Sequence, residues 1–131
     1  MLNITMLYAG ILGVISILLA FGVGRQRGKT GISVGTGDSA ELFIANRRHG
    51  NFVEFVPLAL ILMALLEFNG VGATATHSFG AVLVISRICH PLGMKAGVDT
   101  HPLRAVGAIG TVLLTLVLSI WAIAAFFERL F

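Results

Sequence analysis

Long hydrophobic segments fill this chain and leave little room for other structure. They cover about residues 4–24, 38–68, 74–92 and 102–127. A bilayer core about 30 Å thick is crossed by about 20 helical residues, so four crossings with short connections use all 131 residues. The sequence therefore predicts one domain, residues 1–131, that is an all-α integral membrane bundle of four helices.

The composition is that of a membrane protein. Hydrophobic residues make up 56% of the chain and charged residues 11%, with a mean hydropathy of +0.95, whereas soluble domains carry about 25% charged residues. The net charge of +3 gathers beside the hydrophobic segments, which indicates membrane topology and no nucleic-acid partner. Cys89 is the single cysteine, so no internal disulfide forms, and the histidines are too dispersed for a metal site.

Basic residues are distributed unequally over the connections. The turn at residues 69–72 has none, whereas the first and third connections and their helix edges are basic. The positive-inside rule therefore places the first and third loops in the cytoplasm and both termini outside. No basic residue precedes the first segment, so we expect a retained span and not a signal peptide. The basic residues of these two connections and their helix edges are Arg25, Arg27, Lys29, Arg47, Arg48, Lys95 and Arg104.

Glycine, proline and capping residues set the expected boundaries. A glycine-rich loop is predicted over residues 25–38, and residues 38–41 form a capping box that opens the second helix. Pro57 predicts a kink inside that helix, and Pro102 fits the first position of the fourth. Glycines of the first segment suit close contact with another helix. They are Gly10, Gly13, Gly22 and Gly24.

A polar stripe enters the second hydrophobic segment. Arg47, Asn51 and Glu54 stand at i, i+4 and i+7 and share one helix face. Such a stripe is costly in a membrane unless it meets partners or ligands. Arg87 and His90 share a face at the end of the third segment, and with Arg104 they are expected at the same depth. Two structural roles stay open, an ion pair between Glu54 and Arg87 and an interface or capping role for His90.

Arg104 opens the fourth helix, where a cation opposes the helix dipole. Helix N-terminal amides and a guanidinium together make a strong anion site. Such a site lowers the pKa of a bound thiol and favours the nucleophilic thiolate. The alternative is an arginine that binds lipid headgroups at the interface.

These residues resemble the MAPEG family, the membrane-associated proteins in eicosanoid and glutathione metabolism, and look most like its bacterial members. The resemblance covers essentially the whole chain. Its most specific part is the run of Arg47, Asn51, Glu54 and Pro57. Arg87 with His90, and Arg104, complete the match.

The resemblance implies homotrimers of four-helix subunits with glutathione as co-substrate, no metal, and a cleft between subunits near the cytoplasmic face. Arg47 would then pair with a glutathione carboxylate, Asn51 would hydrogen-bond its backbone, and Glu54 would bind its amino group. Arg104 would stabilise the thiolate. The resemblance also assigns Arg25 or Arg27, Arg87 and His90 to the glutathione site. Three positions depart from hydroxyl-bearing relatives, namely Phe55, Met94 and Ala105.

The function that the resemblance implies is a glutathione transferase, with peroxidase activity as an addition, in a bacterial inner membrane. A hydrophobic electrophile would arrive through the lipid bilayer. Two alternatives stay open. One is a non-catalytic relative that binds glutathione or lipid, and the other is a small four-span transporter that uses Glu54.

Overall fold

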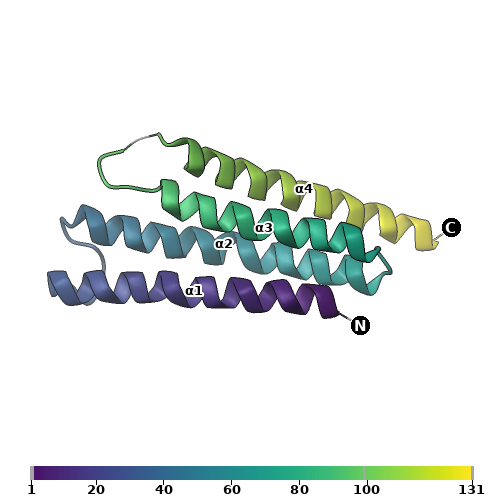
Figure 1. The fold of residues 1–131 in the computed structure, drawn as a ribbon, viewed down its shortest axis with the longest axis horizontal. Coiled ribbons are helices and arrows are strands. Elements are labelled where there is room, and N and C mark those ends of the chain that lie inside the picture. Colours follow the sequence, from purple (N-terminus) through teal and green to yellow (C-terminus); the bar gives the residue numbers. More distant parts are fainter. Residues whose placement is uncertain (1, 99, 131) are drawn as a thin grey trace.

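Four helices run up and down side by side in the computed structural model, which describes residues 2–98 and 100–130, the side chains to residue 128 (Figure 1). The connections 31–39 and 94–101 lie at one end of the bundle, called here the loop end. The turn at residues 69–72 and both termini lie at the other, the terminal end. The helices are α1 (Asn3–Thr30), α2 (Ala40–Phe68), α3 (Ala73–Gly93) and α4 (Pro102–Leu130).

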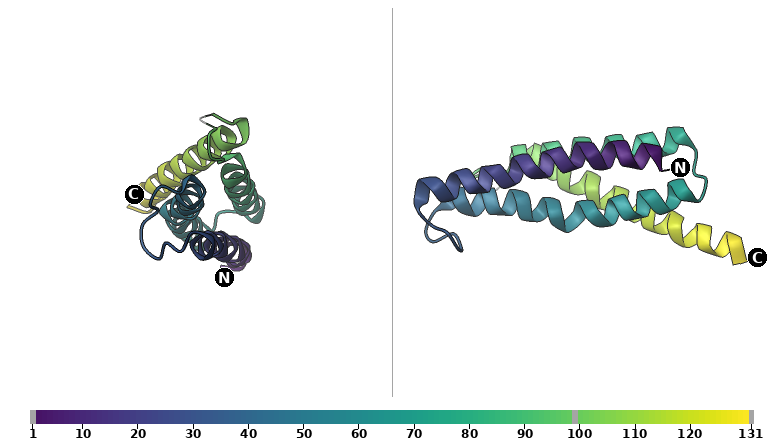
Figure 2. Two further views of the ribbon diagram at one scale, coloured as in Figure 1. Left: turned by 90° about the vertical axis from the view of Figure 1, so that its left-hand side faces the viewer. Right: turned by 90° about the horizontal axis from the view of Figure 1, so that it is seen from below.

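The helices pack in two tight pairs, α1 on α2 and α3 on α4. α3 also contacts α1 and α2, and α4 contacts α2, so α2 and α3 occupy the middle of the bundle. Figure 2 shows α4 crossing the other helices at an angle, with its C-terminal part leaning away from them. The predicted all-α bundle of four helices is confirmed for the described residues.

Three helices are long and apolar enough on their own to cross a membrane. Within the described residues these are Asn3–Thr30, Ala40–Phe68 and Pro102–Glu128. α3, with 21 residues, is about 32 Å long, but it is less apolar because it carries buried Ser86, Arg87 and His90. Because α3 packs against all three other helices, its polar face meets protein.

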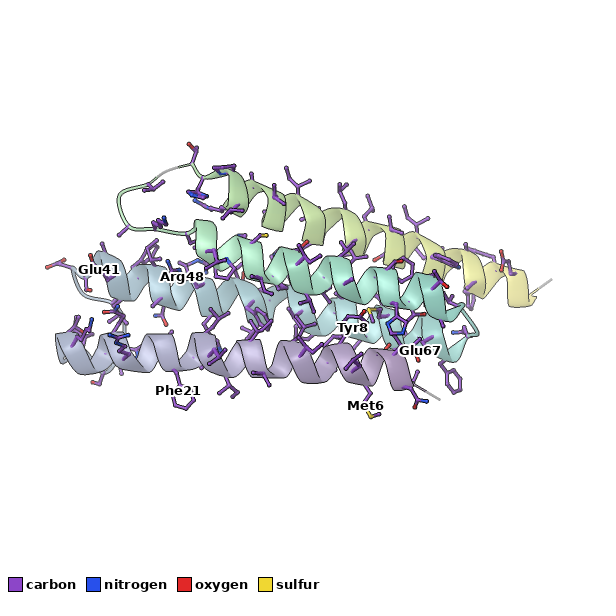
Figure 3. The ribbon with its side chains drawn as sticks, viewed as in Figure 1. Met6, Tyr8, Phe21, Glu41, Arg48 and Glu67 are labelled. Carbon is purple, nitrogen blue, oxygen red and sulfur yellow. The ribbon has the colours of Figure 1, made fainter. Side chains whose placement is uncertain are left out.

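One face of α2 supplies most of the core. Phe52, Val56, Ala59, Met63 and Leu66 follow a spacing of three and four residues and are all buried, as expected for one stripe of an α-helix. The outer surface is apolar too, and Figure 3 shows Met6 and Phe21 standing out from α1. An apolar exterior around an apolar core suits a protein surrounded by lipid or by other subunits. The remaining core residues are Leu12, Leu83, Leu114 and Leu118.

The helix boundaries differ from the prediction at the first loop. α1 continues to Thr30, so the predicted loop is wrong for residues 25–30. Gly31, at a φ of 69°, ends α1 and donates its N–H to the Arg27 carbonyl over 2.9 Å. Ser39 is the N-cap of α2 and accepts from the Leu42 N–H over 3.2 Å, one position after the start of the predicted capping box. α2 then runs without interruption through Pro57.

The glycines that bring helices together are not those of α1. A Cβ added at Gly10, Gly13, Gly22 or Gly24 would meet nothing within 4 Å, so the predicted close contact is wrong within this chain. Instead, a Cβ on Gly107 of α4 would lie 2.5 Å from the backbone nitrogen of His90 and 2.6 Å from the Ser86 carbonyl oxygen. Only glycine allows this approach, which brings the backbones of α3 and α4 together.

Candidate functional site

A buried arginine joins three helices at the loop-end half of the bundle. Arg87 on α3 is only 2% exposed. Its Nη1 donates to Asn51 Oδ1 on α2 over 2.9 Å, and its Nη2 donates to the Gly107 carbonyl on α4 over 3.0 Å. The close packing at Gly107 therefore places an α4 carbonyl within reach of the guanidinium.

The positive charge of Arg87 has little compensation. Its Nε has no hydrogen-bond partner, and its guanidinium lies 5.8 Å from the centre of the Phe55 ring. Among the described residues, Glu54 forms its ion pair with Arg47, over 3.5 Å, so the proposed structural ion pair between Glu54 and Arg87 is wrong. A buried cation held by neutral oxygens and a ring face is costly, which indicates a role that justifies the cost.

The Asn51 amide has one chemically determined orientation. A guanidinium only donates hydrogen bonds, so the amide oxygen of Asn51 must face Arg87. The amide NH₂ group is therefore the part of Asn51 that can donate to a ligand. A recess of about 40 Å³ borders Asn51, Phe55 and Arg87 on the α4 side.

Arg47 and Glu54 lie on the outer face of α2. Their side chains are 46% and 50% exposed, and their ion pair is long at 3.5 Å. A helix turns about 60° between Asn51 and Glu54, so Asn51 reaches α3 whereas the two charged residues point away from the bundle. Of the predicted polar stripe, Asn51 therefore faces the inside of the bundle, whereas Arg47 and Glu54 face outward.

His90 and Arg104 lie one turn closer to the loop end. His90 is buried, with its backbone against Gly107. Arg104 is exposed in the first turn of α4, and its backbone touches Gly93 at the end of α3. It borders a surface cavity of about 430 Å³, together with His101 and Ala108. Asn51, Arg87, His90 and Arg104 therefore all lie in the loop-end half of the bundle.

The two arginines of α1, Arg25 and Arg27, lie elsewhere in the isolated chain. Arg27 Nη1 donates to the carbonyls of Ile32, Ser33 and Gly35 over 3.2, 2.9 and 3.1 Å, and so holds the first loop. Arg25 borders a separate cavity between α1 and α2. Within one chain, neither belongs to the group around Asn51.

Two features of this region were missed by the sequence interpretation. Arg48 was assigned to membrane topology, yet its Nε donates to the Met94 carbonyl over 3.0 Å and its Nη2 binds the same oxygen. The glycine packing of α4 was also missed. The i, i+3 spacing of Gly107 and Gly110 was the available signal, since it puts two residues without side chains on one face of α4.

Comparison with known proteins identifies the relatives of this chain. The family model described as "MAPEG family" matches residues 5–124. The chain is 36% identical over 90 residues, 69% of its own length and 69% of the relative's, to "Inner membrane protein YecN" of Escherichia coli strain K12. The same figures hold for the protein of that name from Escherichia coli O6:H1 strain CFT073. No solved structure matches the chain.

Proposed function

This chain belongs to the MAPEG family, and on that premise we propose that it is a membrane glutathione transferase. It would activate the glutathione thiol for attack on hydrophobic electrophiles that reach it through the bilayer. One observation carries the proposal: groups from α2, α3 and α4 gather at the loop end around the oriented Asn51 amide. These residues and the family support the proposed activity. The names of the relatives state only an inner-membrane location.

Asn51 is the donor that would hold the peptide backbone of glutathione. Arg87 fixes the Asn51 oxygen, so the amide NH₂ is turned toward the ligand before binding and loses little freedom when glutathione binds. Because Arg87 is only 2% exposed, we assign it as a positioning residue that acts through Asn51. The family resemblance assigns His90 of α3 to the same glutathione site.

Arg47 and Glu54 would bind the charged ends of the tripeptide. Arg47 would take a carboxylate and Glu54 the amino group, so a zwitterionic ligand would replace their long mutual contact of 3.5 Å. Charged side chains facing lipid are costly, which supports covering of this α2 face by a neighbouring copy in a homotrimer. The neighbour would also supply Arg25 or Arg27.

Arg104 would stabilise the thiolate. Its guanidinium and the N-terminal amides of α4 both favour an anion. The thiol proton passes to solvent, the sulfur forms a bond to the electrophilic carbon, and the leaving group departs with its bonding electrons. The first and third loops face the cytoplasm in this proposal, because that compartment supplies glutathione. Peroxidase activity is an extension of the same thiolate chemistry.

Single-turnover conjugation of a nitrohalobenzene tests the role of Arg104. We expect Arg104→Ala to remove most of the thiolate absorbance and to slow the chemical step by about 10²–10³, the usual effect of removing one group that stabilises an anion. Lys29→Ala is the matched control, because Lys29 is an exposed cation at the same end of the bundle. If Arg104→Ala keeps both the thiolate signal and the rate, the assignment is wrong.

A double-mutant cycle tests the positioning role of Arg87. Asn51→Ala and Arg87→Met should each weaken glutathione binding, measured by calorimetry, and the double variant should bind no more weakly than Asn51→Ala alone. Additive losses would instead mean that Arg87 contributes independently of Asn51. Methionine keeps most of the buried volume, and a thermal unfolding scan identifies any variant that fails to fold.

A second candidate is a non-catalytic relative that binds glutathione. Phe55 and Met94 carry no hydroxyl, and the Met94 carbonyl is occupied by Arg48, so fewer groups anchor the ligand than in hydroxyl-bearing relatives. Glutathione binding by calorimetry without product formation would favour this candidate over the transferase.

A further inference from the structure

A second polar cavity lies at the loop end, next to Arg48 of α2. It has a volume of about 420 Å³, within the usual size of ligand sites, and is lined by residues of α1 and α2 together with Lys95 and Ala96. Figure 3 shows two of its residues, Glu41 and Arg48, at this end. Except for Arg25, its lining residues take no part in the proposed glutathione site.

The cavity carries an excess of positive charge. Arg25, Arg48 and Lys95 line it together with a single carboxylate, that of Glu41. Arg48 is held in place, since its Nε and Nη2 both bind the Met94 carbonyl. A guanidinium has five N–H donors, so this anchorage leaves others for a ligand. Three cations from three separate segments around one carboxylate are suited to an anion.

The other wall of the cavity is apolar. Leu18 and Leu19 lie about two turns before Arg25 on α1 and line the same space, and Ile44 faces them from α2. α1 is long and apolar enough to span a membrane, so these leucines lie on its membrane side relative to Arg25. The cavity thus offers cations at its outer end and a hydrocarbon surface toward the bilayer.

We propose that this cavity binds the phosphate headgroup of an anionic phospholipid, with an acyl chain along Leu18 and Leu19. Basic pockets between membrane helices bind such headgroups. A free phosphate ion shares the headgroup chemistry but would leave the apolar wall unused. The site can be tested apart from glutathione turnover, because Lys95 and Glu41, unlike Arg25, have no role there.

Native mass spectrometry of the purified full-length protein in detergent tests the proposal, with phosphatidylglycerol, phosphatidylcholine or inorganic phosphate added. We expect retention of phosphatidylglycerol, little retention of phosphatidylcholine, and no displacement of the lipid by millimolar phosphate. Lys95→Gln should weaken phosphatidylglycerol binding about fivefold. Glu41→Gln should strengthen it, because the carboxylate opposes the anion.

Lys29→Gln is the matched control, since Lys29 is a cation at the same end of α1 but does not line the cavity. It should change binding less than twofold. Equal losses in Lys95→Gln and Lys29→Gln, equal retention of both lipids, or displacement by inorganic phosphate would each overturn the proposal. Glu41→Gln gives a test of opposite sign if Lys95→Gln fails to fold. Glutathione conjugation by Lys95→Gln should match that of the unmodified chain, so the two proposals fail independently.

Discussion

At the terminal end of the bundle Glu67 and Tyr8 bind groups of other helices, and one buried oxygen of the described residues there, Thr5 Oγ1, has no hydrogen-bond partner. At the loop end, by contrast, several charged groups face outward or lack partners. The Glu67 carboxylate of α2 accepts from the N–H groups of Ile4 and Thr5 over 2.9 and 2.8 Å. The Tyr8 hydroxyl donates to the His77 carbonyl over 3.0 Å and lies 3.2 Å from His77 Nδ1. Figure 3 shows Tyr8 and Glu67 at this end.

Several charged groups at the loop end are exposed or have a donor atom without a hydrogen-bond partner. Arg47 and Glu54 are about half exposed, and Arg87 is buried with an unpaired Nε. Arg25 and Lys95 border the same cavity. Incompletely paired charges in a membrane mostly serve function, so we expect the terminal end to contribute to stability and the loop end to binding. Substitution of a charged residue at the terminal end should therefore lower stability and spare glutathione binding. Substitution of an exposed charged residue at the loop end should weaken glutathione binding and spare stability.

The largest effect on stability is expected for Gly107→Ala, at the point where the backbones of α3 and α4 pack together. Gly107→Ala would place a Cβ 2.5 Å from the His90 nitrogen, so α3 and α4 must separate and Arg87 must lose its Gly107 acceptor. We expect a loss of about 1–3 kcal/mol in the free energy of unfolding, together with weaker glutathione binding. Denaturant titration in detergent and calorimetry measure the two quantities.

Gly10→Ala is the control for Gly107→Ala. A Cβ at Gly10 meets nothing within 4 Å, so alanine should leave stability unchanged or raise it by up to about 1 kcal/mol through helix propensity. A loss of stability in Gly10→Ala equal to that of Gly107→Ala would show that close packing of α3 and α4 is not the cause.

The second-largest effect on stability is expected at the terminal end, for Glu67→Ala. Glu67→Ala removes the acceptor of two N–H groups in the first turn of α1, and we expect it to cost about 1–2 kcal/mol of stability. Glutathione binding should not change, because Glu67 lies at the far end of the bundle. Glu128→Ala is the control, since Glu128 is an exposed carboxylate near the end of α4. A loss of glutathione binding in Glu67→Ala would contradict the separation of the two ends.

The two helix caps explain how far the sequence predicts this fold. Ser39 caps α2 through the Leu42 N–H three residues away, and local sequence indicates such a cap. Glu67 caps α1 from more than 60 residues away, and this contact exists only once α1 and α2 pack together. Local patterns therefore predicted four helices and most boundaries, but not the tertiary cap or the glycines that pack α3 on α4.

The candidate site was predictable to a similar extent. Helical spacing correctly put Arg47, Asn51 and Glu54 on neighbouring positions of one helix. It did not show that Asn51 turns inward to Arg87 while the charged pair turns outward, because the direction of each side chain depends on where α3 packs. The alternative of a structural ion pair between Glu54 and Arg87 is wrong for the same reason.

The smallest effect on stability is expected for Arg47→Gln, and it gives the sharpest contrast with Glu67→Ala. The Arg47 and Glu54 pair is long and exposed, and such pairs contribute only about 0–1 kcal/mol to stability. Glutathione binding should nevertheless fall about tenfold or more, because a charge-assisted hydrogen bond to the ligand carboxylate is lost. Calorimetry and thermal unfolding of Arg47→Gln beside Lys29→Gln separate the two effects, since Lys29 has the same charge and no assigned ligand. If Arg47→Gln loses stability but keeps glutathione affinity, the outer face of α2 is structural, and the loop end does not differ from the terminal end in the way the contacts indicate.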